Sequence, residues 1–285
     1  MEWPKLKNII ILLLLALNLF FLVLVGEQAY ASNRAQARMQ TETLALLAME
    51  DIHISEKTVP WGGQYESVTL RRDWDQDQEF LLAEKILDGV TARQAGSPAR
   101  YSGNLGSVQF YQSGQFTIQL NPGAVPLEGD AERHAVNYLK ALGISARVKD
   151  LCEGEEGTVT IDLWQLWQEE PLLTCQIQMI YQDNALVSVQ GMRLSGGEPL
   201  ADVSDEGLST ETLLIRLMGA LGGSGHGAGY EIRSILPGYL HRTSGVSAQR
   251  VKLIPVWRLE NGAGEYLLLN CLTGTLEEAY ELSWR

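Results

Sequence analysis

The sequence predicts an α+β fold in which an N-terminal transmembrane helix precedes two antiparallel sheet-plus-helix units. Three observations predict it: an almost wholly apolar segment near the N-terminus, strict apolar–polar alternation in several later segments, and short helical patterns between those segments. The expected organisation is a cytoplasmic tail at 1–7, a transmembrane helix at 8–26, a helical stalk at 27–50, and α+β subdomains at 51–148 and 149–285.

Length and charge limit the class of protein. The chain has 285 residues, of which 45% are hydrophobic, so it can bury a core. Its formal net charge is −13, and no stripe rich in Lys or Arg offers a face for phosphate groups. We therefore expect no nucleic-acid partner.

The N-terminal apolar segment covers residues 9–25. Every residue in it except Ala16 and Asn18 is Leu, Ile, Val or Phe. Each such residue favours insertion at a helix centre by roughly 0.3–0.6 kcal/mol, which together outweighs one polar residue. The segment therefore predicts a membrane helix with lipid as a partner. A cleaved signal peptide is the alternative, because residues 29–31 match its small-residue cleavage pattern.

The flanks of this segment predict its orientation. Lys5 and Lys7 precede it closely, and such charges favour a cytoplasmic N-terminus. Trp3 and Tyr30 would place one aromatic ring near each headgroup region. We expect these four residues to be membrane-interface anchors, with the C-terminal domain extracytoplasmic at the cell membrane.

Asn18 lies at the middle of the apolar segment. An amide at that depth often forms a hydrogen bond to a neighbouring helix. The alternative is a single polar residue that a very apolar helix tolerates. Asn18 is therefore a candidate contact to a partner helix.

The stalk and the first subdomain follow from local patterns. Residues 27–49 contain no Gly or Pro, so the helix should continue through them. A turn at 60–63 should end it. The periodicity then predicts a helix from Asp75 to Gly89, a β-hairpin at 107–120, and a helix at 130–142.

The second subdomain repeats these features. A meander should be followed by a helix, a glycine-rich loop and a closing hairpin. The expected elements are strands at 159–163, 173–179 and from 186, a helix at 210–221, a loop at 222–229, and hairpin strands at 251–259 and 266–271. Trp164 and Trp167 fall on opposite faces of a strand, so we expect one in the core and the other at an interface.

One acidic segment resembles a calcium-binding loop. Asp73, Asp75, Asp77 and Glu84 have suitable spacing, but Gln78 stands where the sharp turn requires glycine. Acidic residues also gather at helix N-termini because of the helix dipole. We therefore favour a helix start over a metal site, with weak calcium binding left open.

No other pattern predicts catalysis. The glycine run at 222–227 lacks the lysine of a phosphate-binding loop, and the four histidines have no metal-ligand spacing. Cys152, Cys175 and Cys271 are too far apart for a metal site, and their residue types fit small buried hydrophobes. We expect no enzyme activity, no cofactor and no metal.

Two segments carry a family resemblance. Residues 1–11, MEWPKLKNIII, followed by Leu17-Asn18-Leu19-Phe20, resemble the opening of the YycI regulators. Residues 253–259, 265–270 and Thr273-Gly274 are similar to the closing hairpin of the YycH/YycI fold and of PepSY-like modules. Together these segments cover about a tenth of the chain.

The resemblance implies a function and its partners. Such a protein would contact a WalK-like sensor histidine kinase and a YycH-like protein, and would tune cell-wall metabolism without catalysis. Its partner interface in the membrane would contain Leu17, Asn18, Phe20 and Phe21. An anchored PepSY-like module that inhibits or escorts a secreted enzyme is the alternative function, and a homo-oligomer is a further possible assembly.

Overall fold

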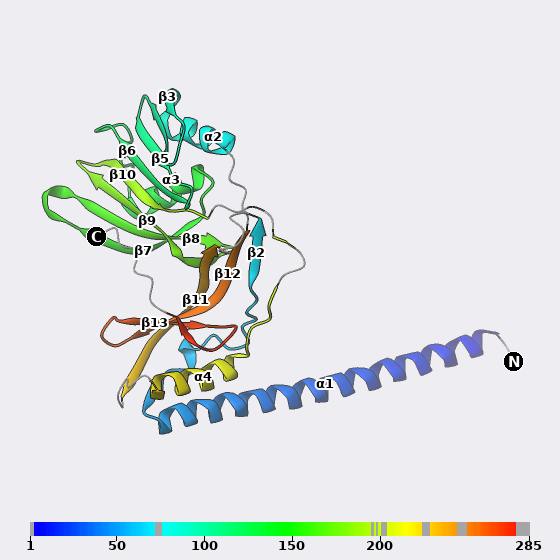
Figure 1. Cartoon of the computed structure of the whole chain (residues 1–285). Coiled ribbons are helices and arrows are strands. Elements are labelled where there is room, and N and C mark those ends of the chain that lie inside the picture. Colours follow the sequence, from blue (N-terminus) through cyan, green and yellow to red (C-terminus); the bar gives the residue numbers. More distant parts are fainter. Residues whose placement is uncertain are drawn as a thin grey trace.

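The computed structural model describes residues 3–71, 76–194, 197, 199–200, 204–223, 229–243 and 250–277. For residues 3–10, 26, 29, 31–33, 76, 156, 223 and 243 it describes the backbone alone. Figure 1 shows a body built mainly of strands, from which one long helix projects to the N-terminus.

Four α-helices, fourteen strands and two short 3₁₀-helices (Glu56–Thr58 and Glu155–Gly157) make up the regular structure of the described residues. The helices are α1 (Trp3–Met49), α2 (Gln76–Leu87), α3 (Ala131–Ala141) and α4 (Thr210–Gly223). The strands up to the middle of the chain are β1 (Ile52–Ile54), β2 (Val68–Arg71), β3 (Val90–Gln94), β4 (Ala99–Gly103), β5 (Gly106–Phe110), β6 (Gln115–Leu120) and β7 (Ala146–Glu153). The later strands are β8 (Val159–Trp167), β9 (Glu170–Gln182), β10 (Ala185–Met192), β11 (Tyr230–Thr243), β12 (Arg250–Asn261), β13 (Tyr266–Asn270) and β14 (Leu276–Glu277).

Several predicted elements are confirmed. The first hairpin is β5 and β6, and the closing hairpin is β12 and β13. The helix expected at 130–142 is α3, whose N-cap Asp130 accepts a hydrogen bond from the backbone nitrogen of Arg133 at 2.9 Å. The helical stalk expected at 27–50 is the second half of α1, which continues without a break for 47 residues.

The predicted fold class was wrong about the sheet. The described strands form one 14-stranded mixed sheet, not two antiparallel units, with the path β14-β13-β12-β11-β9-β10-β6-β5-β4-β3. The two halves join where β11 runs parallel to β9, with Tyr239 paired to Leu172. A second parallel pair forms between β1 and β11. No strand was predicted at residues 230–243, where β11 lies, and Pro237 and Gly238 within it are uncommon residues for the interior of a strand.

The transmembrane part of the predicted fold class is also contradicted. Over the residues that the structure describes, no helix is both long and apolar enough to cross a membrane.

Two large cores and two small ones hold the sheet and helices together. The first core packs α2 and α3 on β4, β5, β6, β8, β9 and β10. The second packs the last turns of α1 and most of one face of α4 on β1, β11, β12 and β13. Two small clusters lie near the junction of β9 and β11, one containing Leu172 and the other Leu173. Since successive strand residues point to opposite faces, both faces of the junction are covered.

Candidate functional site

The apolar part of α1, residues 11–25, is the most unusual surface of the molecule. Its large apolar side chains are exposed by between 45% at Leu24 and 72% at Leu12 and Leu22. The exposed residues lie on all sides of the helix, which projects away from the body (Figure 1). A helix that is apolar all round requires apolar surroundings, and exposed patches of this kind mark interaction sites.

The structure places all four predicted interface residues in this segment. Leu17, Phe20 and Phe21 are exposed by 49%, 60% and 54%, and the two phenyl centroids lie 6.0 Å apart. Asn18 is also exposed, and its side-chain nitrogen donates to the carbonyl oxygen of Leu14 at 2.8 Å. The amide is therefore partly satisfied within its own helix, and its oxygen and second N–H are open to a partner helix.

The predicted membrane-interface anchors are less completely described. Trp3, Lys5 and Lys7 lie in α1, where the structure describes their backbone but not their side chains. Tyr30 is 61% exposed, and the Arg34 guanidinium carbon lies 4.8 Å from its ring centroid. That cation–π contact fixes the ring along the helix beyond the apolar part.

The other end of α1 is held by the body. Thr43 and Leu47 are 6% and 1% exposed, and Leu47 packs with Leu213 and Leu217 of α4. Sequence reasoning identified the stalk but missed this contact. The available signal was the spacing of Thr43, Leu44 and Leu47, which puts all three on one stripe of a helix. The apolar part and the body are therefore connected by one continuous helix.

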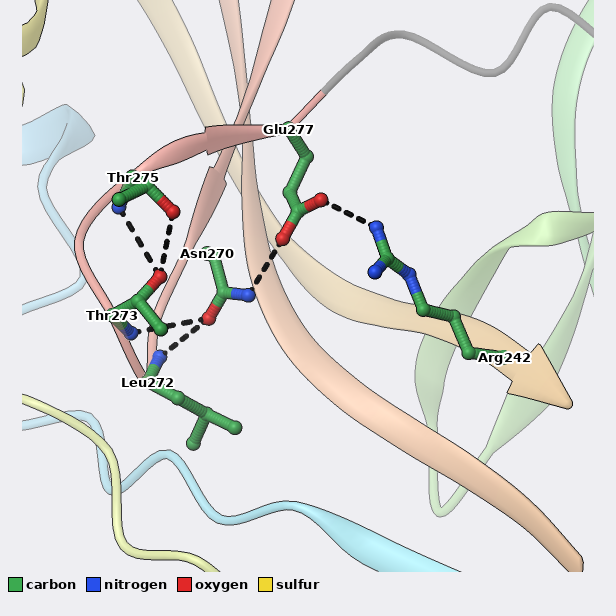
Figure 2. Close-up of polar contacts among 6 residues, drawn as sticks. All are labelled: Arg242, Asn270, Leu272, Thr273, Thr275 and Glu277. Carbon is green, nitrogen blue, oxygen red and sulfur yellow. Dashed lines mark hydrogen bonds and ion pairs between the residues drawn. The ribbon is translucent and has the colours of Figure 1, made fainter. Parts of the chain in front are cut away.

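The turn that follows β13 lies within the second resembling segment and is held by its own side chains. Figure 2 shows Asn270 at its centre. The side-chain oxygen of Asn270 accepts hydrogen bonds from the backbone nitrogens of Leu272 and Thr273 at 2.8 and 3.2 Å. Its side-chain nitrogen donates to Glu277 at 2.7 Å, and the same carboxylate pairs with Arg242 of β11. This network fixes β14 to the sheet, so we assign it a structural role.

The residues considered for chemistry are only partly described by the structure. Asp73 and Asp75 lie outside the described residues, and Asp77 and Glu84 belong to α2. Among the described side chains, no group of three or more His, Cys, Asp or Glu is placed to hold a metal ion. Most of the glycine run, including His226, also lies outside the described part.

The three cysteines are free thiols. Cys175 and Cys271 are buried, as expected, whereas Cys152 is exposed. Burial raises the pKa of Cys175 to about 12 and also raises the pKa of Cys271. Both thiols therefore stay protonated near neutral pH, where a thiolate nucleophile would be needed for covalent catalysis.

Trp164 and Trp167 do lie on opposite faces of β8. Trp164 is 7% exposed and packs with Leu173 and Leu240. Trp167 packs with the cluster on the other face of the junction. Both rings therefore contribute to buried clusters.

Comparisons with known proteins find a solved structure of similar fold but do not assign the chain to a family. No protein-family model matches the chain, and no curated protein matches it. The chain is similar to a solved structure described as an uncharacterized protein from Eubacterium rectale ATCC 33656. The TM-score is 0.51 at 13% sequence identity, and the match covers 76% of this chain and 86% of that one. This likeness shows a shared fold alone, so the YycI resemblance receives no support from it.

Proposed function

We propose that this protein is a non-catalytic regulator that binds a sensor histidine kinase at the cell membrane and thereby tunes cell-wall metabolism. The class of partner comes from the resemblance of residues 1–11 and 17–20 to the YycI regulators. The binding surface is the apolar part of α1, and the body contributes further contacts on the extracytoplasmic side.

One observation carries the proposal: a helical segment that is apolar apart from Asn18 stays exposed, although the same helix is firmly packed at its other end. Leu12 and Leu22 are each 72% exposed, whereas Leu47 is 1% exposed. Covering apolar area is favourable by about 25 cal/mol per Å², so a segment of this kind gains most from an apolar partner helix and from lipid.

The mechanism needs no chemical step. A regulator that binds one signalling state of a kinase more tightly than the other shifts the equilibrium by that difference in affinity. Because α1 joins its apolar part to the body without a break, contacts of the two regions with one partner add up in a single binding event. A YycH-like protein or a second copy could join the same assembly through the remaining sides of the helix.

Site-specific crosslinking tests this proposal. A photoreactive phenylalanine analogue at Phe20 should crosslink a histidine kinase in cells, identified by mass spectrometry of the adduct. The matched control is the same analogue at Leu81, which is 56% exposed on α2 of the body. Replacing Leu17, Phe20 and Phe21 by Ala should remove co-purification of the kinase while the body keeps its melting temperature.

Three outcomes would contradict the proposal. They are crosslinking of the kinase from Leu81 but not from Phe20, kinase binding that persists in the triple-alanine variant, and turnover of a metabolite by the pure protein. Crosslinking of a secreted enzyme at Phe20 in place of a kinase would favour the inhibitor or escort function.

A further inference from the structure

A cleft on the body combines three aromatic rings with one carboxylate. Its volume is about 290 Å³, close to the lower end of the range of roughly 300–1,000 Å³ that is usual for ligand pockets. The rings and the carboxylate come from three parts of the chain: Trp61 and Tyr65 between β1 and β2, Glu170 of β9, and Tyr239 of β11. None of these residues belongs to α1, so the cleft is separate from the surface proposed above.

Two of the rings are already fixed by contacts within the body. The indole nitrogen of Trp61 donates to the backbone carbonyl oxygen of Glu56 at 3.0 Å, and the Tyr65 hydroxyl donates to that of Pro60 at 3.4 Å. The Tyr65 ring also packs edge to face on Trp257, with the ring centroids 5.8 Å apart. A binding site whose side chains are ordered in advance loses less conformational entropy when a ligand enters.

Glu170 gives the cleft a negative charge that no cation of the cleft offsets. The described residues that line the cleft include no Lys, Arg or His, and within the described part of the chain Glu170 forms no ion pair. Arg147 donates instead to the backbone carbonyl oxygen of Glu169 at 2.9 Å. Burial raises the pKa of Tyr65 to about 12 and also raises the pKa of Tyr239, and the charge of Glu170 adds to both shifts. The carboxylate therefore lies near both rings.

The walls of the cleft favour a cation on an apolar stem. The faces of Trp and Tyr rings attract cations, and a carboxylate accepts hydrogen bonds from ammonium or guanidinium N–H groups. Three prolines also line the cleft, and they offer apolar surface without a backbone N–H donor: Pro60, Pro237 and Pro255. Lysine and arginine side chains combine a charged end with an aliphatic stem that covers such apolar surface.

The position of the cleft favours a side chain that enters from another protein. Gly62, Gln64 and Glu170 are lining residues that stay exposed, so the cleft is open to the surface. The chain as a whole has a net charge of −13, which attracts a basic segment of a partner. We propose that this cleft binds a lysine or arginine side chain of a partner polypeptide, with its charged end at Glu170 and its stem along the rings and prolines.

A binding experiment on the full-length chain in mild detergent tests this assignment. The reporter is the ¹⁹F resonance of fluorotryptophan at Trp61, assigned by its loss in Trp61→Phe. The probes are the Nα-acetyl methylamides of lysine, arginine and norleucine, together with tetramethylammonium. The lysine or arginine derivative should shift the resonance saturably, with Kd on the order of millimolar. Norleucine lacks the charge and tetramethylammonium lacks N–H donors, so both should bind more weakly.

Matched variants identify the residues that bind. Glu170→Gln should weaken binding of the lysine derivative roughly fivefold, the upper range for an exposed ion pair. Glu169→Gln is the control, because Glu169 is the exposed neighbour of Glu170 and does not line the cleft. It should leave Kd unchanged. Tyr239→Leu removes one ring and should also weaken binding, whereas Tyr239→Phe keeps the ring face and should bind like the unmodified chain.

The readout does not involve α1, so it stands or falls independently of the kinase-binding proposal. Saturable binding of either cationic derivative that is weakened in Glu170→Gln and kept in Glu169→Gln supports the assignment. The assignment is overturned if neither derivative binds, if norleucine or tetramethylammonium binds as tightly, or if Glu170→Gln and Tyr239→Leu both bind like the unmodified chain.

Discussion

Gly238 of β11 lies against Pro171 of β9 at the point where the two halves of the sheet join. A Cβ atom on Gly238 would stand 2.6 Å from the carbonyl oxygen of Pro171 and 3.2 Å from its Cγ. The neighbouring residues Tyr239 and Leu172 form the one Cα pair that links β11 to β9. Glycine at 238 is therefore a condition for the continuous sheet.

Replacing Gly238 by alanine should weaken the pairing of β11 with β9 that joins the two halves of the sheet. Because the clashing atom is backbone, relief requires movement of a strand, and overpacking of this kind costs about 1–3 kcal/mol or more. The free energy of unfolding, measured by urea denaturation, should fall by at least about 2 kcal/mol. Gly219→Ala in α4 is the control, since its Cβ would meet no atom within 4 Å and alanine favours a helix. Equal stability of the two variants would show that the contact is not tight.

Replacing Leu47 by alanine should loosen α1 from the body. Leu47 is 1% exposed in the core that it shares with α4, and such Leu→Ala changes cost about 2–5 kcal/mol. Thermal denaturation should show the loss, and hydrogen exchange should speed up in the last turns of α1. Leu46→Ala, at a residue 48% exposed, should change stability by less than about 0.5 kcal/mol. Equal losses of stability in the two variants would show that Leu47 is not the residue that packs α1 against the body.

Replacing Tyr138 by phenylalanine should stabilise the protein. Its hydroxyl is buried with no hydrogen-bond partner among the described residues. Such an unsatisfied donor costs about 1–3 kcal/mol, so phenylalanine should gain on the order of 1 kcal/mol at pH 7. Tyr30→Phe, at an exposed ring, should leave stability unchanged. A loss of stability in Tyr138→Phe would mean that the hydroxyl has a partner.

The same residue should contribute to loss of stability in alkali. Burial raises the pKa of Tyr138 from 10.0 to about 12. Between these pH values the unfolded chain loses the proton while the folded protein retains it, so this contribution to stability is complete below pH 10 and is lost as the pH rises to about 12. Tyr138→Phe should flatten that part of the stability curve. The loss should not vanish, because burial raises the pKa of Tyr65 to about 12 as well.

Replacing Asn270 by alanine should release the turn after β13. The substitution removes the hydrogen bonds to Leu272, Thr273 and Glu277 from a residue that is 6% exposed, for an expected cost of about 2–3 kcal/mol. Asn261→Ala is a close match, because Asn261 also accepts two backbone hydrogen bonds and donates to a glutamate, but in a more exposed turn. Asn261→Ala should lower the free energy of unfolding by about 1 kcal/mol or less. Equal losses in the two variants, measured by urea denaturation, would show that burial of Asn270 does not strengthen its hydrogen bonds.

Local patterns accounted for the elements whose signals lie within a few residues. The alternation at 107–120 and the apolar periodicity at 130–142 correctly predicted a hairpin and a helix. β11 was missed because Pro237 and Gly238 are uncommon within a strand, and their place in one depends on pairing with β12 and with β9, which is far away in the sequence. Joining the two units into one sheet could not be predicted for the same reason.

Functional side chains, like the elements of the fold, could be predicted only where the signal is local in the sequence. The apolar part of α1 is contiguous in sequence, so its composition alone marked the segment, and the family resemblance then pointed to Leu17, Asn18 and Phe20 within it. By contrast, Lys149 and Arg258 are more than a hundred residues apart in the sequence, and both approach the indole ring of Trp164. Their proximity depends on the pairing of several strands, and no spacing rule contains that information.

The unbroken course of α1 has a mechanical consequence. Forty-seven residues at about 1.5 Å each make a rod of about 70 Å, clamped near Leu47. A tilt of about one degree at the clamp moves the far tip by about 1 Å, a distance comparable to helix shifts that switch other proteins. A small movement of α4 would therefore produce a larger displacement at the N-terminal end of α1. The long helix would act as a lever that amplifies changes in the body.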